Sequence, residues 1–151
     1  MDYAALTDVL TQQEEALQAL LQLLEREGDA LAANRPQELG QLLQRKADLQ
    51  ERVTGLEKAR LSFCPQEQTL SHIVAQSPAA YQPELTRLQR SMLSLAEHMQ
   101  EANEKNCLLI KQSLDYAQFM LNVFGSVKNC LYGPDGQLAG SIRLRTVNET
   151  A

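Results

Sequence analysis

Hydrophobic residues recur along most of this chain at alternating spacings of three and four positions, which is the period of an α-helix that buries one face. In the first such segment, residues 3–33, leucines follow the pattern when Gln13 and Glu27 are taken to fill the two positions that lack one. These leucines are Leu6, Leu10, Leu17, Leu20, Leu24 and Leu31. The pattern is that of a coiled-coil seam with two polar interruptions, and it predicts a helix over 3–33.

A second helix is predicted over residues 36–63. Pro36 separates it from the first, because proline lacks an amide proton and disfavours helical geometry in the residue before it, and we expect Asn34 to cap its start. Its seam also alternates without a slip, with Lys46 and Arg60 at two positions. Either these basic side chains reach water from the edge of the seam, or they meet acids of the first helix. Two long helices joined by so short a break form an antiparallel hairpin.

The period fails in a segment bracketed by Pro65, Pro78 and Pro83. This segment leaves room for one short helix over about 66–76, which we expect to lay one apolar edge on the bundle. A much longer helix is predicted over 83–131, where the seam alternates without an interrupting proline. At 1.5 Å per residue this helix is roughly 70 Å long, against about 45 Å for each arm of the hairpin.

The long helix carries a second apolar seam beside the first in its C-terminal half. The members of this second seam are Ile110, Leu114, Ala117, Leu121, Phe124 and Leu131. Two neighbouring seams are wider than a two- or three-helix contact needs, and the helix is longer than the hairpin. We therefore expect about residues 112–131 to project and to bind a partner. Pairing of two copies through this surface and a fold-back at Gly125 are the alternatives.

The composition agrees with a helical protein. The chain has 7 Gly, 5 Pro, no Trp and only 5% aromatic residues, whereas a β-sandwich or barrel needs β-branched and aromatic residues with frequent turns. We predict an all-α, coiled-coil-like bundle, made of an antiparallel helical hairpin plus a long C-terminal helix, as one domain over 1–132. Residues 133–151 show no sustained period and are predicted to form a flexible tail.

The charge and the hydropathy exclude several classes of protein. A net charge of −5 argues against a nucleic-acid surface, which needs a basic face. Residues 1–34 alone hold seven acids and one base, and we interpret these acids as the solvated face of the first helix. No apolar run reaches the ~18 residues of a membrane span, and the first residues lack the basic and apolar regions of a signal peptide. We expect a soluble, cytoplasmic protein without membrane insertion.

No constellation of side chains points to catalysis, a metal or a cofactor. Cys64, Cys107 and Cys130 are widely spaced, and we interpret them as small buried hydrophobes. His72 and His98 lie on different elements. We predict that the protein is not an enzyme and holds no cofactor.

Asn103 and Asn106 need a separate account, since asparagine is a modest helix former. Asn106 occupies a seam position, where a buried asparagine selects register and partner. A role in register and a role in binding are both open.

The stretch NEKNCLLIKQSLDYAQFMLNVF, followed by LYGPDG, resembles the C-terminal signature of the FlgN family of flagellar export chaperones. In that family an asparagine pair three residues apart opens an apolar helix, and a turn of the type YG-x-x-G ends it. The distinctive part covers residues 103–136. The acidic, leucine-rich first helix is compatible with the family.

The resemblance implies a small helical chaperone of bacterial flagellar type III secretion. Such proteins bind hook-associated proteins of the FlgK and FlgL type through their C-terminal region, prevent premature assembly and deliver them to the export gate. The client-binding residues would be Asn103, Asn106, Ile110, Leu114, Ala117, Met120, Leu121 and Phe124. By position, Tyr132 would contact the cytoplasmic domain of the gate. The alternative is a structural coiled-coil or adaptor protein that forms a homo-oligomer through the same surface.

Overall fold

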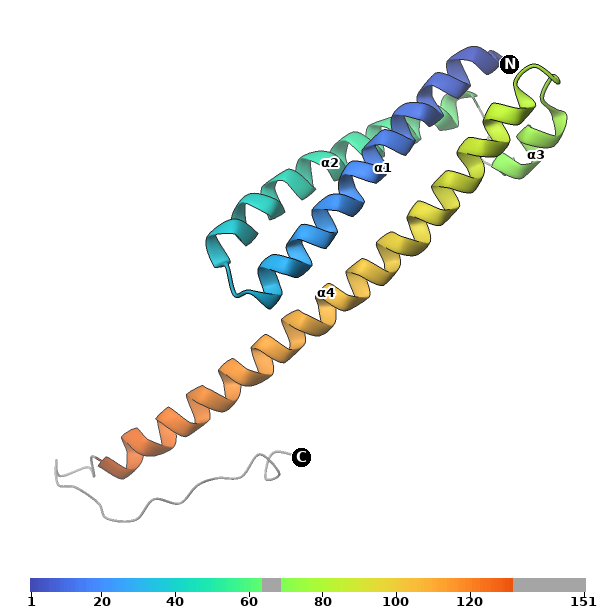
Figure 1. Cartoon of the computed structure of the whole chain (residues 1–151). Helices are drawn as coiled ribbons and strands as arrows, with labels where there is room; N and C mark the ends of the chain where they lie inside the picture. Colours follow the sequence, from blue (N-terminus) through green and yellow to red (C-terminus); the bar gives the residue numbers. More distant parts are fainter. Residues whose placement is uncertain (64–68, 132–151) are drawn as a thin grey trace. The chain divides into compact units, whose positions relative to one another are not determined.

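The computed structural model describes residues 1–63 and 69–131, and side chains as far as Gly125 (Figure 1). The described residues form four helices and no strand, which confirms the all-α fold. The helices are α1 (Tyr3–Ala32), α2 (Pro36–Phe63), α3 (Leu70–Gln76) and α4 (Gln82–Leu131). The chain divides into two compact units, 1–107 and 108–151, and α4 runs from the first into the second.

α1 begins and ends at specific caps. The Asp2 carboxylate accepts a hydrogen bond from the Ala5 amide at 3.0 Å, which satisfies one of the free amide groups of the first turn. At the other end, the Arg35 amide donates to the Ala30 carbonyl at 2.9 Å. Asn34, the residue before Arg35, has a φ of 52°. This is a Schellman motif with asparagine in the left-handed position.

Asn34 therefore terminates α1, and the prediction that it caps the start of α2 is wrong. Asparagine suits either role, because its short amide side chain tolerates the left-handed region and also accepts hydrogen bonds at a cap. Two hydrogen bonds at the end of α1 decide between these roles. The Asn34 amide donates to the Leu31 carbonyl at 3.2 Å, and the Arg35 amide donates to the Ala30 carbonyl.

α1 and α2 pack side by side as an antiparallel hairpin (Figure 1). Near the turn, Leu23, Ala30 and Leu42 form a buried cluster. Leu42 is the sole buried side chain of α2, whereas α1 buries residues along its whole length. α1 is thus the central helix of unit 1–107, because it also contacts α4 through Glu14 and Leu24.

A second and larger cluster closes the other end of unit 1–107. Its buried members are Leu6, Leu10, Ile73, Val74, Leu85 and Leu88, drawn from α1, α3 and α4. Beside it the rings of Tyr3 and Tyr81 stack with centroids 5.9 Å apart. As predicted from the proline-bracketed sequence, the short helix lays its apolar edge, Ile73 and Val74, on the bundle.

Three further expectations change in the structure. The short helix begins only at Leu70, because Thr69 is extended and caps it by accepting from the His72 amide at 3.3 Å. Cys107 is an exposed free thiol and not a buried hydrophobe. The acids of α1 are not all solvated, since Glu14 and Glu27 are buried. Cys64, Cys130 and the predicted tail over 133–151 lie outside the residues whose side chains are described.

Candidate functional site

The two polar interruptions of the first seam, Gln13 and Glu27, are both buried and both meet side chains of α2. Lys46 Nζ donates to Glu27 Oε2 at 2.9 Å, so one of the two basic seam residues does meet an acid of the first helix. Gln13 Nε2 donates to Glu57 Oε2, also at 2.9 Å. The other basic residue, Arg60, pairs instead with Glu57 of its own helix, and it lowers the pKa of that carboxyl. These contacts specify the register of α1 on α2.

Arg87 of α4 joins two carboxylates. Its guanidinium donates to both carboxylate oxygens of Glu14 in α1 at 3.0 Å, and to Glu84 one turn earlier in α4 at 2.8 Å. The hydrogen bonds lower the pKa of both Glu14 and Glu84 and raise the pKa of Arg87. A bidentate arginine of this kind fixes the orientation of α4 on α1.

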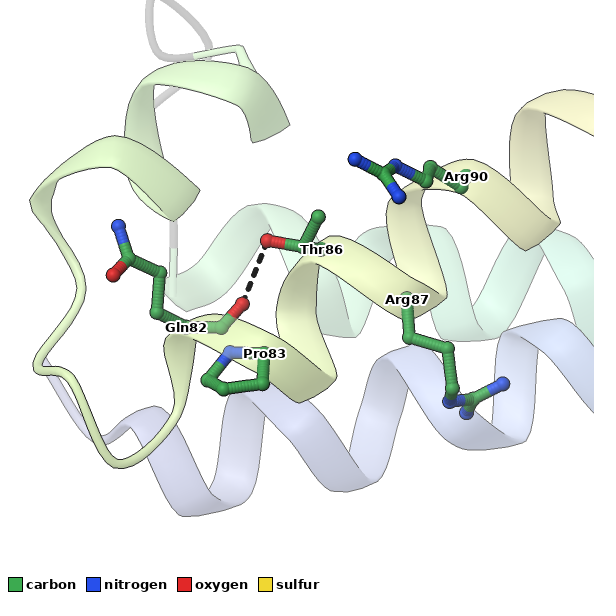
Figure 2. A pocket seen from close by; sticks show the side chains of 5 residues that line it. All are labelled: Gln82, Pro83, Thr86, Arg87 and Arg90. Carbon is green, nitrogen blue, oxygen red and sulfur yellow. Dashed lines mark hydrogen bonds between the residues drawn. The ribbon is translucent and has the colours of Figure 1, made fainter.

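Arg87 also lines a hollow of about 490 Å³ at the start of α4 (Figure 2). The other lining residues are Gln82, Pro83, Thr86 and Arg90. Figure 2 shows the Arg87 head turned toward α1 and the Arg90 head turned away from it. Two carboxylates already neutralise the charge of Arg87, so the Arg87 guanidinium is not free to bind an anion in this hollow.

Asn106 sits at a close approach between α4 and α1. Its side chain is 3% exposed, and its amide donates to the Leu24 carbonyl at 2.8 Å. The neighbouring α1 position is Gly28, where an added Cβ would lie 2.6 Å from Asn106 Oδ1. Glycine is therefore required here for the asparagine to reach the α1 backbone. The register role of Asn106 is the one that these contacts support.

Beyond Asn106 the side chains of α4 change character. Throughout 108–125 no described side chain is buried, and many of the exposed ones are large and apolar. They are Leu108, Ile110, Leu114, Tyr116, Phe119, Leu121 and Phe124, with exposed fractions from 40% to 66%. Exposed apolar side chains in this number make the segment a candidate site of interaction with another molecule.

The apolar side chains occupy two faces of this half of α4, because each helical residue turns by about 100°. Face A consists of Ile110, Leu114, Ala117, Leu121 and Phe124. Face B consists of Leu108, Leu109, Tyr116, Phe119 and Val123. A narrow polar stripe, Lys111, Asp115, Gln118 and Asn122, separates them on one side. Within the stripe, Gln118 donates to Asn122 at 3.1 Å.

A comparison with protein-family models shows which family this chain belongs to. The FlgN protein family matches residues 1–140, which is most of the chain. The chain belongs to the FlgN family. This is a family of flagellar export chaperones. A search of curated proteins and a search of solved structures gave no significant match.

Most of the residues predicted for client binding in this FlgN protein lie together on face A. Ile110, Leu114, Ala117, Leu121 and Phe124 make up that face, and Met120 is a half-buried neighbour at its edge. Asn103 is exposed but lies in unit 1–107. Asn106 is buried against α1, so its side chain is not available to a client. Tyr132, the predicted gate contact, lies outside the described residues.

Three exposed side chains of face B escaped the sequence-based prediction of the binding surface. These side chains are Leu108, Tyr116 and Phe119. The sequence pattern of a heptad seam is the same whether another helix packs on the seam or leaves it exposed to water. The signal that could have found them is the width of the apolar arc, which a helical projection of residues 108–124 makes visible.

The histidines and acids of the described residues form no chemical centre. No group of three or more His, Cys, Asp or Glu side chains there could hold a metal ion. His98 Nδ1 lies 2.7 Å from the Ser94 carbonyl oxygen of its own helix, and His72 is exposed on α3. None of the described helices is both long and apolar enough to span a bilayer.

Proposed function

We propose that this FlgN-family protein is a cytoplasmic chaperone that binds hook-associated proteins of the FlgK and FlgL type through residues 108–124 of α4. The observation that carries the proposal is the exposed apolar surface of that segment, in a chain that belongs to a family of export chaperones. The surface suits an amphipathic helix of a client, which would bury its own apolar face there and so be kept from assembling.

Face A is the first place to test client binding. We propose the variant Leu114→Asp with Leu121→Asp, because both side chains are about two-thirds exposed and burying an unpaired carboxylate in an interface costs several kcal/mol. The matched control is Lys111→Asp with Gln118→Asp, which places two aspartates at the same spacing of seven on the polar stripe. Client co-purification should be lost in the first variant and kept in the control.

Circular dichroism separates loss of binding from loss of folding in this test. Both buried clusters lie in unit 1–107, so the face A variant should keep the unfolding temperature of the wild type. If a folded face A variant still co-purifies with hook-associated proteins, the client site lies elsewhere. If the free protein unfolds, these leucines belong to a core.

Delivery to the export gate is the second half of the proposal, and it rests on Tyr132. A tyrosine offers a rigid ring and one hydroxyl group, which makes it a frequent anchor of protein interfaces. Tyr132→Ala should leave client co-purification intact but reduce client secretion and binding to the cytoplasmic domain of the gate. Loss of client binding, or unchanged binding to the gate, would contradict the assignment.

A structural adaptor that self-associates is the alternative, because the same exposed apolar surface would serve a contact between copies. Light scattering after size-exclusion chromatography distinguishes the two functions. The adaptor requires a stable oligomer in the absence of any client, whereas the chaperone is expected to form a larger complex when the client is added.

A further inference from the structure

The apolar surface of residues 108–124 is wider than one partner helix can cover. Successive residues turn by about 100°, so the apolar positions from Leu108 round to Leu114 span an arc of roughly 240°, in which Gln112 and Ser113 are the polar positions. The stripe that one packed helix covers is only about 100° wide. A single amphipathic helix on face A would leave face B in water.

Both faces hold large exposed side chains, but every member of face A is exposed, whereas Leu109 and Val123 of face B are half-buried. On face A, Leu114, Leu121 and Phe124 are 65%, 66% and 62% exposed. On face B, Leu108 is 56% exposed and Tyr116 is 65% exposed. Since the described residues leave large apolar side chains exposed on both faces, each face can take a partner.

The lack of charged side chains on both faces indicates what kind of partner fits them. Between residues 108 and 124, the charged side chains are Lys111 and Asp115, and both lie in the polar stripe. Faces A and B therefore offer no charge to a basic or acidic peptide. They offer large apolar side chains at helical spacing over about 24 Å, which suits the apolar faces of helices about five turns long.

We propose that one client chain presents two amphipathic helices to this segment at once, one on face A and one on face B, while the polar stripe stays in water. This rests on the proposed function and makes it more specific. A pair of identical chains joined through one face would leave the other face bare on each copy. A two-helix client covers both faces in a complex of one chaperone with one client.

The test measures client affinity by calorimetry for three matched double variants. Leu114→Asp with Leu121→Asp tests face A, and Tyr116→Asp with Val123→Asp tests face B. Lys111→Asp with Gln118→Asp is the control on the polar stripe. All three pairs have the same spacing of seven. Each face variant should raise the Kd by about 100-fold or more, which corresponds to roughly 2.7 kcal/mol, and the control should stay within about threefold.

Photocrosslinking supplies an independent measurement of the same proposal. A photoreactive residue placed at Leu114 should crosslink to one segment of a full-length hook-associated protein, and one placed at Tyr116 should crosslink to another. A single crosslinked segment for both positions would overturn the two-helix proposal.

The outcomes distinguish this inference from the proposed function on which it rests. If the face A variant loses the client and the face B variant binds like the control, one helix suffices and only the two-helix inference fails. If neither face variant loses affinity, the proposed function fails as well. If the free chain forms a dimer that the face B variant dissociates, face B is a contact between copies and the inference is overturned.

Discussion

At the scale of single residues, Gly28 and Asn106 show how a close helix contact is specified. The short amide side chain of Asn106 reaches a backbone carbonyl of α1, and it does so only because position 28 lacks a Cβ. Neither residue is informative alone. A glycine in a helix interior ordinarily lowers stability by roughly 0.5–1 kcal/mol relative to alanine, so its presence requires a reason.

Gly28→Ala is expected to destabilise the protein by about 1 kcal/mol. The new methyl group would displace the Asn106 amide and break its buried hydrogen bond to Leu24, at a cost of roughly 1–3 kcal/mol, which the better helix propensity of alanine offsets only in part. Gly40→Ala and Gly55→Ala are the matched controls, because no atom lies within 4 Å of a Cβ added at either position. Urea unfolding should show both controls to be neutral or stabilising.

The effect of Gly28→Ala on stability should change sign when the Asn106 side chain is removed. In a chain that carries Asn106→Ala, the obstacle is gone, and Gly28→Ala should become stabilising by about 0.5–1 kcal/mol. A Gly28→Ala effect that is the same with and without Asn106 would show that the two side chains do not interact.

At the scale of whole helices, polar contacts join α1 to its neighbours at defined points. Lys46 anchors α2 on Glu27, and Arg87 anchors α4 on Glu14. The apolar seams alone would allow α1 to slide by a heptad against either neighbour, since leucines repeat along them. A slide would leave a buried carboxylate without its partner, which is strongly unfavourable.

The contact between Arg87 and Glu14 predicts a pH-dependent stability. Arg87 lowers the pKa of Glu14 from its ordinary value of 4.5, so the stabilisation is present above pH 4.5 and is lost as the pH falls through the lowered folded-state value. Arg87→Gln should therefore lower the melting temperature at pH 7. The difference from the wild type should shrink as the pH falls below about 4.5, because Glu14 of the unfolded chain is protonated first, and it should vanish once the pH is below the lowered pKa of Glu14 in the folded wild type.

Arg90→Gln is the control for that measurement, because Arg90 lines the same hollow as Arg87 and is exposed, and none of the ion pairs between described residues involves it. Thermal unfolding of both variants across pH 3–7 makes the comparison. Equal melting temperatures for the two variants at pH 7 would contradict a stabilising contact between Arg87 and Glu14.

At the scale of the whole molecule, stability and binding are divided between two parts of the chain. Both buried clusters lie in unit 1–107, whereas every described side chain from Leu108 to Gly125 is exposed or half-buried. A chain that ends after Cys107 should therefore keep its cooperative unfolding, with a melting temperature within a few degrees of the full-length protein, and should bind no client. Calorimetric scans and client titrations check the two halves of this prediction.

A marked loss of melting temperature in that shortened chain would show that residues after Cys107 stabilise unit 1–107. Retained client binding would place the client site before residue 108, where Asn103 is the exposed residue predicted for it. Either result would contradict the assignment of stability to unit 1–107 and of client binding to the residues after Cys107.

The all-α fold class followed from the heptad period, and so did the seam positions of Gln13 and Glu27. A period reports which residues share one side of a helix, and it is a local property of the sequence. The apolar surplus on the C-terminal half of α4 was visible for the same reason, since face A is a second period beside the first.

The tertiary structure alone decided which polar groups meet. It paired Glu27 with Lys46 and Arg60 with Glu57. It placed Asn34 at the end of α1, and it directed the Asn106 amide to a backbone carbonyl of α1. It also showed that Leu108, Tyr116 and Phe119 of face B are exposed. These outcomes depend on which residues of distant segments come within about 3 Å of each other, and a helical period holds no information on such distances.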